Sequence, residues 1–361
     1  MSSTIQNQYM PDYVSPPGET LLETIEAIGM SQADLAERTG RPKKTINEII
    51  KGKAAITQET ALQLERVLGI PASFWNNREH KYREALARIE EKERLQRDVE
   101  WLKDIQVKAL IKAGWVRAFN DRVQQVQEAL NYFGVASPER WREIWLGAQV
   151  SYRKSPAFQS DPGAVAAWLR KGELDARQID CDPYDESKFK ETLHAVRSLT
   201  DKTPDVFQAE IVRLCAKSGV AVVFTPELPK TRISGATRWL NPNKALIQLS
   251  LRYKTDDHLC FTFFHEAGHI LLHGKKEVFI ESDGDTDAKE AEANRYAANF
   301  LIPPAELKRL PKSANISKKA IVSFAKEIGI SPGIVVGRLQ HEGILKRSFC
   351  NDLKQSFKWE K

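Results

Sequence analysis

The sequence contains few cysteines and no long apolar run. Its cysteines are scattered and none forms a C-x-x-C pair, which argues against a cysteine zinc site and a disulfide framework: Cys181, Cys215, Cys260 and Cys350. No apolar run approaches the ~18 residues of a membrane helix, so no membrane association is expected. The N-terminal stretch MSSTIQNQYMPDYVSPPGET lacks the basic-then-apolar pattern of a secretory signal. We therefore expect a cytoplasmic protein.

Length and charge set the scale of the molecule. A chain of 361 residues is too long for one small domain and suggests two or three, and 42% hydrophobic residues allow proper cores. The net charge of +6 is mild, so the location of the charge is more informative than its size.

The segment FFHEAGHILLHG, residues 263–274, contains histidines at a spacing of four. Residues four apart lie on the same face of an α-helix, so His265 and His269 can direct their imidazoles at one point. With Glu266 beside them they form the H-E-x-x-H arrangement of a zinc metallohydrolase. In that chemistry the histidines bind the metal, and the glutamate takes a proton from the attacking water. The alternative is a core helix whose histidines form local hydrogen bonds, and a third ligand decides between the two.

A second helix is predicted downstream, in DAKEAEANRYAANFLIPP (residues 287–304), because alanines favour a helix and the proline pair ends it. Glu290 and Glu292 are both candidates for the third ligand, since a catalytic zinc takes three protein ligands and one open position. His273 continues the histidine row but lies about one turn beyond the metal. We expect it to cap the helix end.

This second segment resembles the E-x-x-A-N-x-(aromatic)-A-x-x-(L/F)-L-x-P signature of the ImmA/IrrE metallopeptidases, and the resemblance extends over roughly residues 204–345. The resemblance favours Glu290 over Glu292, and Asn294 stands one turn on, where it can hydrogen-bond a ligand histidine. The expected site is a Zn²⁺ ion bound by His265, His269 and Glu290, with Glu266 as the catalytic base.

Residues 234–257 alternate apolar and polar residues around an Asn-Pro-Asn turn, which predicts a β-hairpin leading into the zinc helix. Zincins commonly bind substrate antiparallel along such an edge strand, so we expect backbone pairing along this hairpin to position a peptide. Four residues remain open as oxyanion stabilisers: Tyr253, Tyr296, Arg238 and His341.

The N-terminal third contains helix start and stop residues at the positions expected for a helix-turn-helix. Between Met30 and Ile70, Ser31 is a good N-cap, Gly40 ends a first helix, and Pro42 suits the first turn of a second. The interior face of the second helix is apolar: Ile46, Ile49 and Ile50. With the apolar-periodic runs on either side, the segment predicts a bundle of about five helices.

The charge of this segment fits DNA. Residues 31–53 contain six basic and three acidic residues. The second helix of such a motif lies in the major groove. The candidates for base contacts are Arg41, Lys43, Lys44, Thr45 and Asn47, and those for phosphate contacts are Gln32, Lys51 and Lys53. The alternative is a solvated bundle with ordinary surface lysines.

Residues 17–75 resemble repressor domains of the xenobiotic-response-element type, in particular the HigA-like antitoxins, in PGETLLETIEAIGMSQADLAERTG and INEIIKGKAAITQETALQLERVLGIPASFW. The resemblance implies a homodimer that binds an inverted repeat in its own promoter, and a cognate toxin as partner.

The expected organisation is a helix-turn-helix domain at 1–78, a helical middle region at 79–200 and a zinc metallopeptidase domain at 201–361. The expected fold is mainly α, with a C-terminal α+β zincin-like domain containing a small antiparallel sheet. Three functions fit: an autoregulating antitoxin of a toxin–antitoxin operon, a regulatory metalloendopeptidase that cleaves a repressor or another partner protein, or a zinc-bound peptide- or toxin-binding module without turnover.

Overall fold

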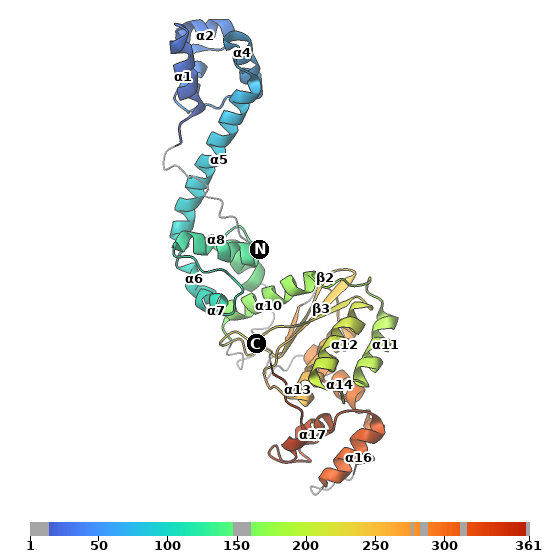
Figure 1. Cartoon of the computed structure of the whole chain (residues 1–361). Coiled ribbons are helices and arrows are strands. Elements are labelled where there is room, and N and C mark those ends of the chain that lie inside the picture. Colours follow the sequence, from blue (N-terminus) through green and yellow to red (C-terminus); the bar gives the residue numbers. More distant parts are fainter. Residues whose placement is uncertain (1–13, 147–159, 276–277, 282–287, 311–315, 359–361) are drawn as a thin grey trace. The chain divides into compact units, whose positions relative to one another are not determined.

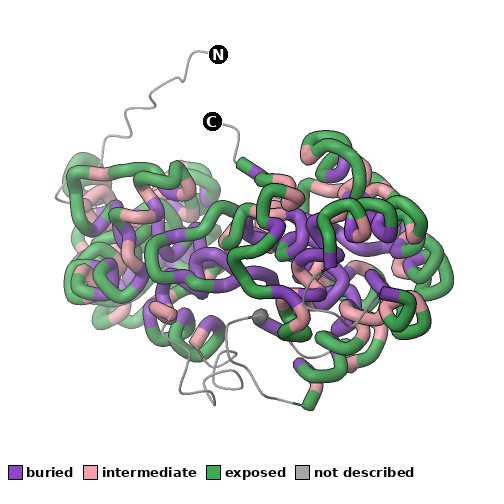
Figure 2. The backbone as a smooth tube through the Cα atoms, turned by 90° about the horizontal axis from the view of Figure 1, so that it is seen from below, coloured by how far each residue is buried: buried purple, intermediate pink, exposed green. Residues whose placement is uncertain are grey.

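The computed structural model of the chain describes residues 14–146, 160–275, 278–281, 288–310 and 316–358. The chain divides into two compact units, Met1–Asp98 and Val99–Lys361, each with buried segments inside and exposed residues on its outer turns (Figures 1 and 2). Helices dominate, and the described strands form one small sheet in the second unit. The predicted fold class is thereby confirmed.

The described part of the first unit is a bundle of five helices: α1 (Pro17–Ala27), α2 (Gln32–Thr39), α3 (Lys43–Ile50), α4 (Gln58–Leu68) and α5 (Ala72–Arg97). Ser31 caps α2 as predicted, because its hydroxyl accepts the Asp34 N–H at 3.2 Å while the Asp34 carboxylate accepts the Ser31 N–H at 3.0 Å. The apolar faces of the helices meet in one core, which includes Leu21, Ile25, Leu35, Ile46, Ile49, Leu64 and Trp75.

Helix α5 begins inside this bundle, where Ala72 and Trp75 are buried, and continues without a break through the charge-rich stretch to Arg97. Ion pairs one turn apart run along its exposed part, such as Arg88–Glu84 at 2.7 Å and Arg94–Glu91 at 2.8 Å. Such pairs add about 0.3–0.5 kcal/mol each to an exposed helix. The first unit therefore extends beyond residue 78.

The second unit starts with a run of helices: α6 (Trp101–Asp104), α7 (Val107–Lys112), α8 (Arg122–Phe133), α9 (Pro138–Trp141) with a π-helical turn at Arg142–Leu146, α10 (Pro162–Arg177), α11 (Glu186–Arg197) and α12 (Pro204–Ala216). Helix α10 begins at Pro162, where the Asp161 side chain accepts the Ala164 N–H at 3.0 Å. Three tryptophans of this region lie in the core: Trp141, Trp145 and Trp168.

The described strands form a sheet in the order β1-β3-β2-β4: β1 (Val220–Phe224), β2 (Gly235–Asn241), β3 (Lys244–Leu249) and β4 (Phe279–Glu281). The predicted hairpin is present as β2 and β3, which pair antiparallel. The sheet differs from the antiparallel expectation because β1 pairs parallel with β3. Strand β1 is a continuous apolar run covered by α10 on one face and α12 on the other, which is typical of parallel strands.

The hairpin is not the edge of the sheet, in contrast to the expectation that a peptide would pair along it. Strand β4 pairs antiparallel with β2, from Gly235 opposite Glu281 to Thr237 opposite Phe279. A three-residue strand was too short to be seen in the sequence pattern. In the described part of the chain, β4 forms the outer strand on that side.

Helix α13 (Asp256–Leu272) packs on β2 and β3, on the face of the sheet opposite α10. Helices α14 (Ala288–Leu301) and α17 (Pro332–His341) pack against α13, α16 (Lys318–Ile328) packs against α17, and α15 (Pro304–Leu307) is a short helix after α14. No single described helix is long and apolar enough to cross a membrane; α16 and α17 meet that length and composition only as a pair bent by 113°.

The start of α13 is anchored by buried carboxylates. Asp256 accepts hydrogen bonds from the Ser331 hydroxyl and from the Gln355 N–H, and Asp257 pairs with Lys354 at 2.6 Å. Because these partners lie on α17 and in the C-terminal segment, they fix where α13 enters the core.

The end of α14 is held by a single guanidinium. Arg197 on α11 donates to the carbonyls of Phe300 at 3.1 Å, Leu301 at 2.9 Å and Ile328 at 3.0 Å. These are carbonyls at the C-termini of α14 and α16, which have no partner within their own helices.

We expect Arg197→Met to lower the free energy of unfolding of the second unit by about 2 kcal/mol, because it leaves these half-buried carbonyls without a donor. The matched control is Arg213→Met on α12, which removes only an exposed pair with Glu210 and should leave the unfolding midpoint unchanged. Denaturant unfolding followed by circular dichroism measures both, and equal midpoints for the two variants would contradict the role of Arg197.

Candidate functional site

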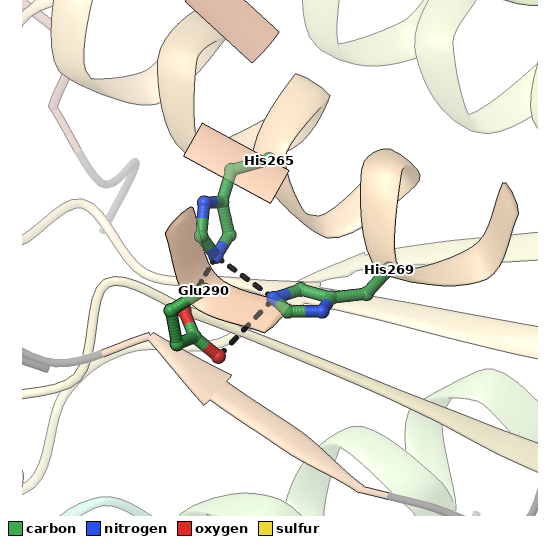
Figure 3. A group of neighbouring side chains, drawn as sticks. All are labelled: His265, His269 and Glu290. Carbon is green, nitrogen blue, oxygen red and sulfur yellow. Dashed lines mark hydrogen bonds and ion pairs between the residues drawn. The ribbon is translucent and has the colours of Figure 1, made fainter. Parts of the chain in front are cut away.

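Three buried side chains from two helices converge in the second unit (Figure 3). The Nε2 atoms of His265 and His269 on α13 lie 2.9 Å apart. The Glu290 carboxylate on α14 approaches them, with Oε2 at 3.0 Å from His265 and Oε1 at 3.3 Å from His269. One ligand atom from each residue lies within 4.8 Å of the others, so the group can hold a metal ion.

Gly268 allows α14 to come this close to α13. A Cβ added at Gly268 would lie 3.1 Å from the ring of Tyr296 and 3.4 Å from the Cα of Ala293, so a side chain there would require the Tyr296 ring to shift by a few tenths of an ångström. Glu290 lies one turn before Ala293 on α14. The missing side chain at Gly268 thus accommodates the close packing of α14 on α13 near the carboxylate.

The charges of the cluster suit a cation. Burial raises the pKa of Glu290, but the hydrogen bonds from His265 and His269 outweigh it and lower the pKa to about 2. Burial lowers the pKa of His269 below its usual value, against the opposing effect of Glu290. At neutral pH the cluster therefore offers an ionised carboxylate and a neutral imidazole, which are the forms that bind metals.

The outer nitrogen of the first histidine has the predicted partner. The Nδ1 atom of His265 lies 3.0 Å from the Asn294 side-chain oxygen, to which it can donate. Glu292, the other candidate for third ligand, lies instead against His273, with Oε2 at 3.3 Å from Nε2. The structure therefore brings Glu290, and not Glu292, to the histidine pair.

In the first unit, α3 presents the start of a helix without a side-chain cap, because its N-cap is Pro42. Lys43 and Lys44 are exposed there, and Asn47 one turn on donates to the Gln32 side chain of α2 at 3.4 Å. The backbone N–H groups at such a helix start favour the binding of phosphate groups. The other candidates lie nearby in sequence: half-buried Thr45 and the exposed Lys51 and Lys53 after α3.

Arg41 stands apart from this set. Its guanidinium donates to Gln63 at 2.7 Å and pairs with Glu59 at 3.0 Å, both on or beside α4. In this conformation Arg41 ties α4 to the turn before α3, and its charge is not directed outward with those of the lysines.

Two separate segments of the chain match known protein families. Residues 21–75 match the helix-turn-helix family, and residues 215–340 match the peptidase family described as the IrrE N-terminal-like domain. The chain carries a helix-turn-helix domain and an IrrE-like domain. A search of curated proteins gave no match.

Solved structures similar to this chain align over less than a quarter of it. One is a putative antidote protein of a plasmid maintenance system from Nostoc punctiforme (30% identity, 23% of this chain and 94% of that chain, TM-score 0.23). The others are a HigA-family addiction module antidote protein from Coxiella burnetii (28%, 23% and 92%, 0.22) and the Pseudomonas aeruginosa antitoxin HigA with the higBA promoter (27%, 24% and 94%, 0.22).

In the IrrE-like domain, Glu266 is fully buried and packs beside β2. A Cβ added at Gly235 would lie 2.6 Å from the Glu266 Oε1 atom, and Thr237 donates to the Glu266 backbone carbonyl at 3.1 Å. Gly235 is a residue that the sequence pattern did not mark, because its importance depends on the register of β2 against α13.

The four candidates for oxyanion stabiliser are not equivalent. Arg238 is excluded because successive residues of a strand face opposite sides: Thr237 contacts α13, whereas Arg238 pairs with Glu173 on α10 at 2.9 Å. Tyr296 packs at the Gly268 crossing, and His341 is exposed at the end of α17. The Tyr253 ring stacks on the His258 ring near the start of α13, with centroids 4.3 Å apart.

The geometry predicts one divalent metal ion per chain, bound by the converging group. In elemental analysis of the purified chain, His269→Ala should lose most of the bound metal. Glu290→Gln and Glu292→Gln are a matched pair two residues apart on one helix; the first should lose most of the bound metal and the second should lose much less. Full metal retention in His269→Ala, or loss in Glu292→Gln alone, would contradict the assignment.

Proposed function

We propose that this chain is a DNA-binding transcriptional regulator whose IrrE-like domain is a zinc metallopeptidase. The observation that carries the proposal is the convergence of His265, His269 and Glu290, with Glu266 next to the first ligand on the same helix. The match of residues 215–340 to a peptidase family supports it.

The donor set supports zinc as the metal. Two imidazole nitrogens and one carboxylate oxygen are a common ligand set of catalytic zinc, which leaves a fourth position open for water or substrate. Zinc, when bound, supplies Lewis-acid activation of a water and a carbonyl at neutral pH. Glu266 would take the proton of the attacking water and pass it to the departing amine.

Strand β4 is the proposed place for the substrate. Its Phe279 ring stacks on the His269 ring with centroids 4.1 Å apart, so the strand runs beside the cluster. A peptide added antiparallel along β4 would be positioned by backbone hydrogen bonds, with its carbonyl near the metal ligands.

For the helix-turn-helix domain we propose an inverted repeat in its own promoter as the operator, bound by a homodimer in the cytoplasm. The exposed Lys43 and Lys44 at the start of α3 and the paired Gln32 and Asn47 support contacts to the major groove. The finer proposal is an autoregulating antitoxin that neutralises a cognate toxin, which rests on the resemblance of residues 17–75. The alternatives are an endopeptidase that cleaves a repressor or other partner protein and a binding module without turnover.

A DNA-binding experiment tests the regulator. The full chain should prefer its own promoter to random DNA, with affinity falling steeply as salt rises. Asn47→Ala and Lys44→Ala should reduce discrimination between bases by about 1–3 kcal/mol. Lys53→Ala should weaken binding to all sequences alike and reduce the salt slope by about one. Equal binding to promoter and random DNA at physiological salt would contradict the proposal that the domain recognises an operator in its own promoter.

The Glu266→Gln variant separates peptidase from binding module. It should keep zinc and fold, because Glu266 is not among the converging ligand atoms, and lose ~10²–10⁴-fold in cleavage rate. In cells, an antitoxin that acts by holding its toxin should protect as well with Glu266→Gln as without, and we expect this result. His269→Ala at matched expression is the control.

A Glu266→Gln phenotype as severe as that of His269→Ala, with zinc retained, would instead make proteolysis the primary function.

A further inference from the structure

The ring of His273, at the end of α13, touches the outer nitrogen of a ligand histidine. Its Nδ1 atom lies 2.9 Å from the Nδ1 atom of His269, and its Nε2 atom lies 3.3 Å from the carboxylate of Glu292 on α14. The His273 side chain is only 4% exposed, whereas that of Glu292 is 52% exposed. A chain of hydrogen bonds thus runs from the buried cluster to the surface.

Only one arrangement of protons satisfies every contact when His269 uses Nε2 as a ligand. The proton of His269 must then lie on Nδ1, which donates to the Nδ1 lone pair of His273. The proton of His273 must therefore lie on Nε2, which faces the Glu292 carboxylate. The carboxylate completes the chain as acceptor, so each of the three groups determines the orientation of the next.

The position of His273 as helix cap does not explain this geometry. The cap is formed by its backbone, whose N–H donates to the His269 carbonyl at 3.1 Å, and any residue can make that bond. The ring packs in addition against Phe279 of β4, with centroids 5.2 Å apart. The side chain is therefore held in place by contacts separate from the cap.

We propose that His273 and Glu292 are positioning residues, which hold the His269 ring in the tautomer and orientation that bind the metal. This inference rests on the proposed function, since it requires a metal at the cluster. Glu290 would bind the metal directly, whereas Glu292 would act on it only through His273 and His269. His273 would be neither a metal ligand nor only a helix cap.

The test measures metal affinity of the full chain by competition with a chromophoric chelator, using zinc. His273→Leu should weaken zinc binding by about 10–100-fold. His273→Asn places an amide oxygen where Nδ1 stood and should restore most of the affinity. Leu272→Ala, at the exposed neighbouring position, is the control for disturbance of the helix end and should bind as the parent does.

A second variant changes Glu292, whose side chain is exposed, so it avoids a substitution inside the core. Glu292→Ala should weaken zinc by up to about tenfold, and in the His273→Leu background it should have no further effect, because Glu292 acts only through His273. The absorption bands of the Co²⁺-loaded chain should shift in His273→Leu and return toward those of the parent in His273→Asn.

Parental zinc affinity and an unchanged Co²⁺ spectrum in His273→Leu would overturn the positioning role while leaving the zinc site in place. Additive losses of zinc affinity in the double variant would contradict the claim that Glu292 acts only through His273. Absence of zinc binding by the parent chain would overturn the proposed function together with this inference.

Discussion

The close crossing of α13 and α14 at Gly268 is the constraint on which the second unit depends. Gly268 contributes no side chain there, so Ala293 and the ring of Tyr296 pack directly on α13, and Glu290 on the preceding turn of α14 lies 3.0 Å from His265. Contacts far from the cluster maintain this geometry: the carboxylates at the start of α13 bind α17 and the C-terminal segment, and Arg197 holds the end of α14. Packing contacts across the whole unit therefore support the cluster.

The two units carry their chemistry in different ways. In the helix-turn-helix domain the candidate DNA contacts are exposed lysines and half-buried amides near a helix start, where small changes cost little stability. In the IrrE-like domain the candidate ligands are buried imidazoles and a carboxylate, which are stable only as a complementary set because an unpaired buried charge is costly. Substitutions in α3 can thus alter DNA binding without disturbing the cluster, which makes the two activities separable by experiment.

Local patterns in the sequence predicted the parts of the fold that have short-range causes. Spacing by four predicted the α13 histidine pair, alternation predicted the β2–β3 hairpin, and the Ser31 cap predicted α2. What the sequence could not supply depends on register and crossing angle. The pairing of β4 with β2, the side of the sheet that Arg238 faces and the packing of Gly235 against Glu266 all follow from tertiary placement. The sequence favours Glu290 over Glu292 by resemblance and by the position of Asn294, whereas the packing of α14 on α13 places Glu290 at the histidine pair and Glu292 at His273.

The central claim is that His265, His269 and Glu290 meet on one ion. X-ray absorption spectroscopy of the zinc-loaded full chain tests it most directly, because imidazole rings give a characteristic outer-shell pattern. The account predicts four nitrogen or oxygen neighbours at about 2.0–2.2 Å, two of them imidazole nitrogens, and no sulfur. A sulfur neighbour, or a light-atom shell without imidazole scattering, would contradict it.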